Sequence, residues 1–261
     1  MSQQGQWDPG QYERFATERA QPFHDLLGLV QPVPGGRVVD LGCGTGELTQ
    51  LLHQRSGAEA TVGIDTSSSM LDKAAAHAGG GLTFGPGDLR DPPGDRPFDV
   101  VFSNAALQWV PEHPTVLATW ASWLSPRGQL AVQVPANVDH PSHTVSAQLA
   151  SEEPFRSALG GSPVPDPVLS VLTPQEYAQI LFDLGFGEQT VRLQVYGHVM
   201  DSTRDVVEWV KGTSLTRFKV VMPDDVFAEF LVEYERRLID ELGDRSPFFY
   251  GFKRVLMWAR R

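Results

Sequence analysis

The sequence predicts an α/β protein built on one mostly parallel sheet. From Arg37 onward, short apolar segments alternate with helix-like segments, and Gly or Pro stands at many of the boundaries. This alternation is typical of parallel strands joined by helices that cover both faces of the sheet. The predicted strands are 37–41, 60–64, 82–84, 98–103, 128–134, 188–199 and a last one in the tail "FKRVLMWARR".

The intervening segments carry helix signals. The Ser-rich "TSSSML" offers hydroxyl side chains that suit an N-cap, and Pro174 lies near the first position of a helix that Gly185 ends. The predicted helices of this part of the chain are 46–54, 67–77, 114–124, 143–158 and one that runs from Pro174 to Gly185.

The segment between the last two predicted strands is helical rather than a simple turn. Both "STRDVVEWVKGTSLTRF" and "PDDVFAEFLVEYERRLIDEL" place apolar residues at spacings of three and four. An insertion of this size predicts a cap. The expected organisation is N-terminal lid helices in 1–30, an α/β domain in 31–200 and 249–261, and a helical cap in 201–248.

Composition excludes several classes of partner. The 261-residue chain has a formal net charge of −11 and no Lys/Arg cluster, which disfavours nucleic-acid binding and favours a small-molecule partner. No apolar run approaches the roughly 18 residues of a spanning helix, and "MSQQGQWDPGQYERF" lacks an apolar h-region, so we expect a cytosolic protein without a membrane partner. The single Cys43 permits neither an internal disulfide nor a multi-cysteine metal site, and no metal is predicted. The oligomeric state stays open.

The segment "DLGCGTG" predicts a ligand-binding turn. Gly42, Gly44 and Gly46 follow a buried-looking strand, where the backbone can approach a ligand at the carboxyl end of a parallel sheet. The dinucleotide fingerprint spaces its glycines as G-x-G-x-x-G, whereas here the third comes one residue early and Glu47 follows it. Asp65, at the end of the next strand, suits both hydroxyls of a ribose, which serves NAD as well as other adenosine cofactors.

Two later segments complete a cofactor pattern. "FGPGDLRD" places Asp88 and Leu89 after the third strand, and "FDVVFSNAALQWV" places Asn104 after the fourth. Together with "VVDLGCGTG" and "GIDTSSSML", they resemble the class I methyltransferases that use S-adenosylmethionine. The resemblance implies a Rossmann-like sheet of seven strands with the last one antiparallel, and S-adenosylmethionine as the cofactor.

The resemblance also implies roles for individual residues. Asp40 and the glycine turn would hold the amino-acid end of the cofactor, Asp65 the ribose, and Asp88 with Leu89 the adenine. A lid of Trp7, Tyr12, Phe15 and Arg19 would cover the cofactor, although these aromatic side chains could simply dock the first helix on the sheet. The predicted cofactor-binding residues are Trp7, Tyr12, Arg19, Asp40, Gly42, Cys43, Gly44, Gly46, Asp65, Thr66, Met70, Asp88, Leu89, Asn104 and Ala105.

Within this class, four segments resemble the trans-aconitate 2-methyltransferase family: "WDPGQYERFATERAQP", "NAALQWVPEH", "LAVQVPAN" and "VEWVKGTSL". This resemblance implies O-methylation of a carboxylate on a small polycarboxylic acid. A carboxylate is already ionised at neutral pH, so no general base is needed, while the other carboxylates call for Arg and amide donors. The predicted positioning residues are Gln108, Trp109 and Arg217. Further predicted acceptor contacts are Gln133, Trp209, Tyr250 and Arg254.

Several alternatives stay open at this point. His113 and His198 could be bases, although a satisfied or exposed histidine is more common. The acceptor could instead be an acyl-carrier-bound malonyl group or a lipid-like acid. The chain could also be a nicotinamide-dependent dehydrogenase, or a cofactor-sensing binding protein without catalysis.

Overall fold

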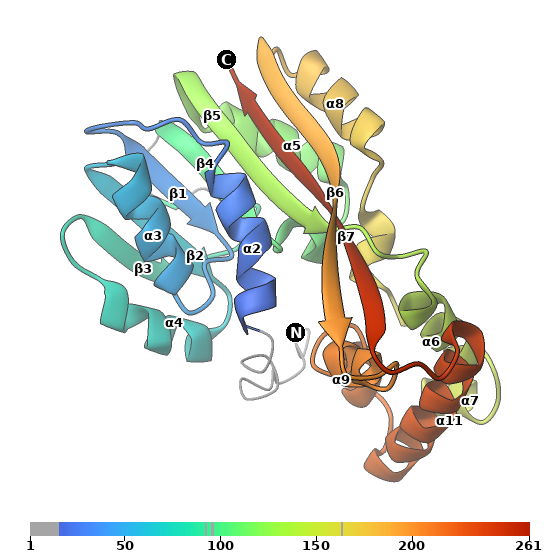
Figure 1. The fold of residues 1–261 in the computed structure, drawn as a ribbon. Helices are drawn as coiled ribbons and strands as arrows, with labels where there is room; N and C mark the ends of the chain where they lie inside the picture. Colours follow the sequence, from blue (N-terminus) through green and yellow to red (C-terminus); the bar gives the residue numbers. More distant parts are fainter. Residues whose placement is uncertain (1–15, 92, 95–96, 163) are drawn as a thin grey trace. The chain divides into compact units, whose positions relative to one another are not determined.

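The fold is centred on a seven-stranded sheet (Figure 1). The computed structural model describes residues 16–91, 93–94, 97–162 and 164–261. Along the sheet the strand order is β3-β2-β1-β4-β5-β7-β6. The strands are β1 (Arg37–Leu41), β2 (Ala60–Asp65), β3 (Leu82–Pro86), β4 (Phe98–Asn104), β5 (Leu124–Pro135), β6 (Glu188–Met200) and β7 (Phe248–Arg260).

The strand directions confirm the predicted fold class. β1 pairs in parallel with both β2 and β4, β2 with β3 and β4 with β5, whereas β7 is antiparallel to β5. The chain leaves β1 in one direction along the sheet to form β2 and β3, and returns to the other side of β1 to form β4. The carboxyl ends of β1 and β4 therefore flank the topological switch point, where open α/β sheets bind ligands.

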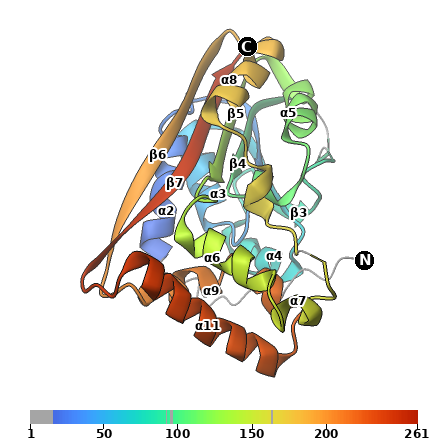
Figure 2. The ribbon, with the colours of Figure 1, turned by 90° about the vertical axis from the view of Figure 1, so that its right-hand side faces the viewer.

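Helices cover both faces of this sheet, as the two views show (Figures 1 and 2). On one face Phe23 of α2 contacts Phe102 of β4, with ring centroids 5.2 Å apart. On the other face α5 and α8 contribute Leu117 and Tyr177 to the main hydrophobic core, which also contains Val101 of β4. The helices of this part of the chain are α2 (Ala16–Leu27), α3 (Glu47–Ser56), α4 (Ser68–Ala74), α5 (His113–Ser122) and α8 (Pro174–Asp183).

The structure divides into two compact units, each with its own core. The α/β unit contains Ala20–Ala136, Ser170–Gln194 and Lys253–Arg261. The described part of the second unit, here called the cap unit, contains Asn137–Leu169 and Val195–Phe252. It therefore includes a segment before β6 in addition to the predicted cap segment 201–248. No helix in the described ranges is long and apolar enough to span a bilayer.

The cap unit is held together by aromatic side chains. Phe230 lies at its centre and contacts Phe155 and Phe218, with ring centroids 5.2 Å and 5.0 Å away, and stacks with Tyr234 at 6.3 Å. Large aromatic side chains bury enough area to fix short helices that would not be stable alone. The helices are α6 (Pro141–Ala150), α7 (Phe155–Ala158), α9 (Asp205–Lys211), α10 (Thr216–Lys219) and α11 (Asp224–Leu242).

One predicted helix is wrong in its extent. The sequence predicts a single helix over 143–158, but the structure has α6 end at Ala150 and a short α7 begin at Phe155. Pro154 explains the break, because proline has no N–H for the preceding helical turn and its ring clashes with that turn. The helix predicted over 67–77 also changes, since α4 gives way to a 3-10 turn at Ala75–His77.

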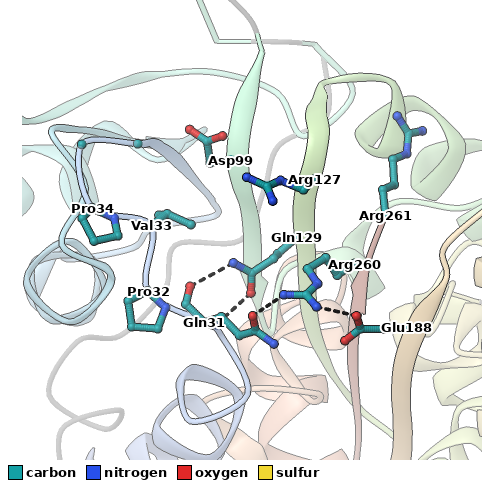
Figure 3. Close-up of a pocket in the computed structure, with 12 residues that line it drawn as sticks. Gln31, Pro32, Val33, Pro34, Asp99, Arg127, Gln129, Glu188, Arg260 and Arg261 are labelled. Atoms are coloured by element: carbon teal, nitrogen blue, oxygen red, sulfur yellow. Dashed lines mark hydrogen bonds and ion pairs between the residues drawn. The ribbon is translucent and has the colours of Figure 1, made fainter.

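A surface cavity of about 670 Å³ lies at the amino ends of the parallel strands, on the opposite edge of the sheet from the glycine turn (Figure 3). Gln129 of β5 organises this edge. Its Oε1 accepts hydrogen bonds from Gln31 N at 2.8 Å and from Trp258 Nε1 at 2.9 Å, and its Nε2 donates to Gln31 O at 2.9 Å. One buried amide thus ties the Gln31–Gly36 loop to two strands.

Replacing Gln129 with Leu should destabilise the fold strongly. The substitution removes three hydrogen bonds and leaves the Trp258 Nε1 donor and the Gln31 backbone groups without this partner, so we expect a loss of about 2–4 kcal/mol in the free energy of unfolding. Urea denaturation measures the change. Gln179→Leu is the matched control, because Gln179 is exposed and its side chain bonds Asp183, one turn away on the same helix. Equal stability of the two variants would contradict the role assigned to Gln129.

Candidate active site

The glycine turn after β1 is left-handed at each glycine. Gly42, Gly44 and Gly46 have φ values of 83°, 55° and 80°. A Cβ on Gly42 would lie 2.4 Å from Ala106 Cβ, and one on Gly46 would lie 2.8 Å from Ala74 Cβ. A Cβ on Gly44 would meet no atom of the described chain within 4 Å. The outer two glycines therefore permit close packing, and the middle one leaves open space where a ligand can approach the backbone.

Asp65 at the end of β2 braces this turn. Its Oδ2 accepts a hydrogen bond from Gly44 N at 3.0 Å, and its Oδ1 accepts one from Ser67 N at 2.9 Å. Ser67 in turn caps α4, since its side chain accepts from Met70 N. Each carboxylate oxygen keeps a further lone pair. Asp65 can thus hold the turn and still accept two hydroxyl groups.

The helix after the turn presents free backbone donors. α3 begins after Gly46, and no side chain among the described residues caps it. Its first-turn N–H groups lack intrahelical partners and carry the positive end of the helix dipole, which suits a carboxylate. Glu47 opens this helix and would repel a pyrophosphate.

A second carboxyl group, that of Asp40, is buried beneath the turn. Thr49 Oγ1 donates a 2.6 Å hydrogen bond to Asp40 Oδ2. Burial raises the pKa of Asp40 to about 7, the Thr49 hydrogen bond lowers it in part, and the charge of Asp65 raises it further. Two carboxyl groups beside one glycine turn create a field that attracts a cation and repels a phosphate.

Cys43 lies between these groups and is not an activated thiol. Its side chain is buried, and burial followed by the charges of Asp40 and Asp65 raises its pKa far above the ordinary value. A nucleophilic cysteine requires a lowered pKa. Cys43 therefore contributes packing at the turn.

The loop after β3 places Asp88 at the same edge of the sheet. The Arg90 side chain donates two hydrogen bonds to the Asp88 carboxylate, from Nε to Oδ1 at 2.8 Å and from Nη2 to Oδ2 at 2.6 Å. These hydrogen bonds, led by those of the Arg90 side chain, lower the pKa of Asp88. Leu89 is buried, and its carbonyl accepts a 2.6 Å hydrogen bond from Trp120 Nε1 of α5. Thr66 is exposed and Met70 half-buried at the start of α4.

The end of β4 carries backbone strain and an unpaired acceptor. Ala105 has a φ of 56°, a value that non-glycine residues rarely adopt. Its N–H donates to Gln133 O at 2.9 Å, and its carbonyl accepts from Gln108 Nε2 at 2.6 Å. Asn104 Oδ1 is buried without a hydrogen-bond partner in the described chain. The open acceptor at this strand end is thus the Asn104 side chain, because Ala105 already uses both its backbone groups.

Further unpaired groups lie close by in the α/β unit. Gln108 Oε1 and Gln133 Nε2 are buried and have no partner among the described residues, while Arg254 Nη1 donates to Gln133 Oε1 at 3.1 Å. Trp109 is 58% exposed, which is unusual for so large an apolar side chain. These four residues form a polar and aromatic group at the carboxyl ends of β4 and β5.

The remaining predicted site residues belong to the cap unit or lie outside the described residues. Trp209, Arg217 and Tyr250 belong to the cap unit and are mostly buried there. Trp7 and Tyr12 lie outside the described residues, as do Phe15 and the side chain of Arg19. His113 is buried and its Nδ1 bonds Tyr177 OH at 2.6 Å, while His198 stacks on Trp209 with centroids 4.7 Å apart. His113 is thus buried away from solvent, and His198 has one face covered by Trp209.

The chain matches known proteins in three comparisons. The family described as "Methyltransferase domain" matches residues 38–128. A relative named trans-aconitate 2-methyltransferase from Deinococcus radiodurans is 41% identical over 98% of each chain, and one from Streptomyces avermitilis is 39% identical over 98% of this chain and 97% of its own. The chain belongs to the trans-aconitate 2-methyltransferase family.

Members of the trans-aconitate 2-methyltransferase family are methyltransferases, and this chain is an S-adenosylmethionine-dependent one. A solved structure of a putative methyltransferase from Bacillus halodurans shares its fold, with a TM-score of 0.58 and 16% identity over 91% of this chain and 97% of that one. The site fits the cofactor, because a turn with open space, an orphaned amide oxygen and buried carboxyl groups suit a cationic ligand. The dehydrogenase alternative is excluded by the family.

Thr49 and Arg90 hold two of the predicted site carboxyl groups, Asp40 and Asp88, in roles that the sequence does not indicate. Thr49 was assigned only to a helix, yet it holds the buried Asp40 carboxyl group. Its position two residues after Glu47, on the inner face of an amphipathic helix, is the only available signal. Arg90 stands in the quoted "GDLRD", but sequence alone does not indicate that it turns back onto Asp88.

Gly44→Ala and Gly46→Ala should have different effects. Both place a Cβ at positive φ, which costs roughly 1–2 kcal/mol, but only the Gly46 variant also clashes with α4. Gly46→Ala should therefore lose more stability in thermal unfolding. Gly44→Ala should lose cofactor affinity in calorimetric titration, since its methyl group enters the open space. Wild-type affinity of Gly44→Ala would show that the cofactor does not use this space.

Cofactor affinity should depend on pH through Asp40. As the pH rises through about 7, Asp40 ionises and attracts the cationic cofactor, so affinity should rise by up to about ten-fold from about pH 6 to about pH 8. Asp40→Asn should remove this rise, whereas the exposed Asp72→Asn should keep it.

The titration of Asp40 should also make the stability of the fold depend on pH, in the direction opposite to that of cofactor affinity. Because the folded pKa of about 7 lies above the ordinary 3.8, the folded state binds more protons between these values and the free energy of unfolding falls as the pH rises through this window. Asp40→Asn should remove that slope in urea denaturation series.

Proposed function

We propose that the protein transfers the methyl group of S-adenosylmethionine to a carboxylate of trans-aconitate, giving the monomethyl ester and S-adenosylhomocysteine. The observation that carries this proposal is the 41% identity, over 98% of both chains, to a relative named trans-aconitate 2-methyltransferase. On this proposal the acceptor is a small anionic molecule, and the reaction takes place in the cytosol.

Residues of the α/β unit would hold the cofactor. The N-terminus of α3 offers backbone N–H groups for its carboxylate. Asn104 Oδ1, which no described residue bonds, is an acceptor for its ammonium group. Asp65 would accept from the ribose hydroxyls, and Asp88 from the adenine amino group, with Leu89 beside the ring. Asp40 would contribute charge from below the turn rather than direct contact, because it is buried.

Methyl transfer to a carboxylate requires the side chains to orient the two substrates and does not require acid–base catalysis. When bound, S-adenosylmethionine supplies an electrophilic methyl group on a positively charged sulfur. A carboxylate has a reference pKa near 4 and is ionised at neutral pH, so no residue has to remove a proton. This agrees with the histidines, since both His113 and His198 are engaged in contacts inside their units.

The α/β unit also offers groups that would orient the acceptor. Gln133 Nε2 is a buried donor without a partner among the described residues, and Arg254 Nη1 holds Gln133 in place by donating to its Oε1. Gln108 fixes the strained Ala105 carbonyl, which sets the position of Trp109 in the following turn. We propose that these residues hold an acceptor oxygen in line with the methyl group and exclude water, which lowers the entropic part of the barrier to transfer.

Incubation with labelled S-adenosylmethionine and a panel of organic acids tests the proposal. We expect a trans-aconitate monomethyl ester by mass spectrometry, with a lower kcat/KM for monocarboxylic acids of similar size. Gln133→Leu should lower kcat, because it removes a positioning donor, while it leaves cofactor affinity unchanged. Methylation of fatty acids or an acyl-carrier malonyl group in preference to every polycarboxylate would overturn the assignment of the acceptor.

A further inference from the structure

The cavity at the amino ends of the parallel strands is lined by residues of the α/β unit alone (Figure 3). Its volume of about 670 Å³ is typical of small-molecule sites. Three of the side chains that line it are arginines, Arg127, Arg260 and Arg261, and two are acidic, Asp99 and Glu188. A chain with a net charge of −11 thus gathers cationic groups at this edge of the sheet.

The two acidic side chains of the cavity already have partners. Asp99 Oδ1 accepts a hydrogen bond from Ser125 Oγ at 2.7 Å, and Asp99 Oδ2 accepts one from Arg37 N at 2.9 Å. Glu188 forms an ion pair with Arg260, so these two charges balance each other in the cavity wall. Neither carboxylate is therefore engaged with the other two arginines.

Arg127 and Arg261 carry charges that no described residue pairs. Both residues are exposed, and no hydrogen bond or ion pair joins either guanidinium group to the described part of the chain. The Arg261 guanidinium lies 5.8 Å from the centroid of the Phe186 ring, a contact that orients a cation without neutralising it. Each guanidinium group has five N–H donors and no acceptor. The cavity wall thus offers unused donors with positive charge.

An irregularity in β5 places Arg127 at the cavity. Phe98 of β4 pairs with Leu124 of β5, but Val100 pairs with Gln129, so the register advances by two residues on β4 and by five on β5. The additional residues of β5 form a bulge that carries Arg127. Bulges redirect side chains and are common beside binding sites. Arg127 is therefore displaced from the regular ladder to the rim of the cavity.

The backbone of this bulge also brings the second arginine close. Gly128 O accepts a hydrogen bond from Arg261 N at 3.4 Å. A Cβ on Gly128 would lie 2.9 Å from Leu124 Cβ, so the bulge requires a glycine at this position. Arg127 and Arg261 therefore start from adjoining backbone segments and line the same cavity.

The chemistry of the wall selects an anionic ligand. Guanidinium groups bind the oxygens of carboxylates and phosphates through paired N–H donors. Pro32, Val33 and Pro34 form an apolar part of the same wall, which suits the carbon skeleton of an organic molecule. A cation would be repelled by Arg127 and Arg261.

We propose that Arg127 and Arg261 form a second binding site, for a small organic dianion that carries phosphate or carboxylate groups. The site lies at the edge of the sheet opposite to the glycine turn, so it is separate from the site of methyl transfer. A ligand that binds only the folded state also stabilises it. The site does not rest on the acceptor proposed above.

Calorimetric titration of pyrophosphate and of citrate into protein saturated with S-adenosylhomocysteine tests the site. Arg127→Gln removes a charge without breaking a contact in the described chain, so the affinity for the preferred probe should fall at least about ten-fold. Arg127→Lys keeps the charge but loses the paired donors, so its loss should be smaller. The probe with the higher affinity shows whether phosphate or carboxylate groups are preferred.

Arg192→Gln is the matched control for these titrations. Arg192 is an exposed arginine of β6 in the same unit, and it does not line the cavity. This variant loses the same charge from the protein as a whole, so it should keep the wild-type affinity for both probes. Equal losses in Arg192→Gln and Arg127→Gln would reduce the effect to net charge and overturn the site.

Nuclear magnetic resonance locates the bound anion. Trp258 Nε1 donates to Gln129, which lines the cavity, whereas Trp120 Nε1 donates to Leu89 O in the loop after β3. Pyrophosphate or citrate should therefore shift the indole resonance of Trp258 and leave that of Trp120 unchanged. The Trp258→Phe variant assigns the resonance.

The remaining outcomes are equally decisive. Absence of binding of both probes to the wild-type protein at millimolar concentrations would overturn the site, as would unchanged affinity in Arg127→Gln. Binding that is lost in Gln133→Leu but kept in Arg127→Gln would assign the anion to the acceptor site instead. None of these measurements depends on methylation of trans-aconitate, so this proposal and the proposed function fail separately.

Discussion

The candidate active site depends on one carboxylate, that of Asp65. It accepts hydrogen bonds from Gly44 N in the glycine turn and from Ser67 N at the start of α4, so it joins the carboxyl ends of β1 and β2. It adds to the backbone hydrogen bonds that Gly42 N and Cys43 N donate to Ile64 O of β2, and it is the link that reaches Gly44. The open space at Gly44 and the uncapped start of α3 both follow from that fixed turn.

Charge then decides which ligand this turn can hold. Glycine turns at helix N-termini commonly bind phosphates, because the backbone N–H groups and the helix dipole attract an anion. Here Asp40, Asp65 and Glu47 add negative charge around the same backbone. The combination suits a zwitterionic ligand with an additional positive centre, whose carboxylate meets the helix start and whose cationic groups meet the carboxylates. It is a poor environment for a pyrophosphate.

Much of the fold could be predicted from the sequence, because strand and helix patterns are local. The seven strands and the antiparallel last strand agree with the structure, whereas the single helix predicted over 143–158 is wrong, because the chain breaks it before Pro154. The partners of the site residues could not be predicted. Asp166 reaches Arg217 from a distant segment of the chain, and the positive φ of Ala105 has no sequence signal of its own.

The hydrogen bonds around Gln133 have a consequence for the order of binding events. Gln133 O fixes Ala105, next to the free acceptor of Asn104, and Gln133 Oε1 holds Arg254. Gln133 thus connects the groups proposed to bind S-adenosylmethionine with those proposed to bind the acceptor. If binding at one end orders this chain of hydrogen bonds, binding at the other end costs less conformational entropy, and thermodynamic linkage makes that effect reciprocal. The two substrates are therefore expected to assist each other's entry, so that the ternary complex forms cooperatively.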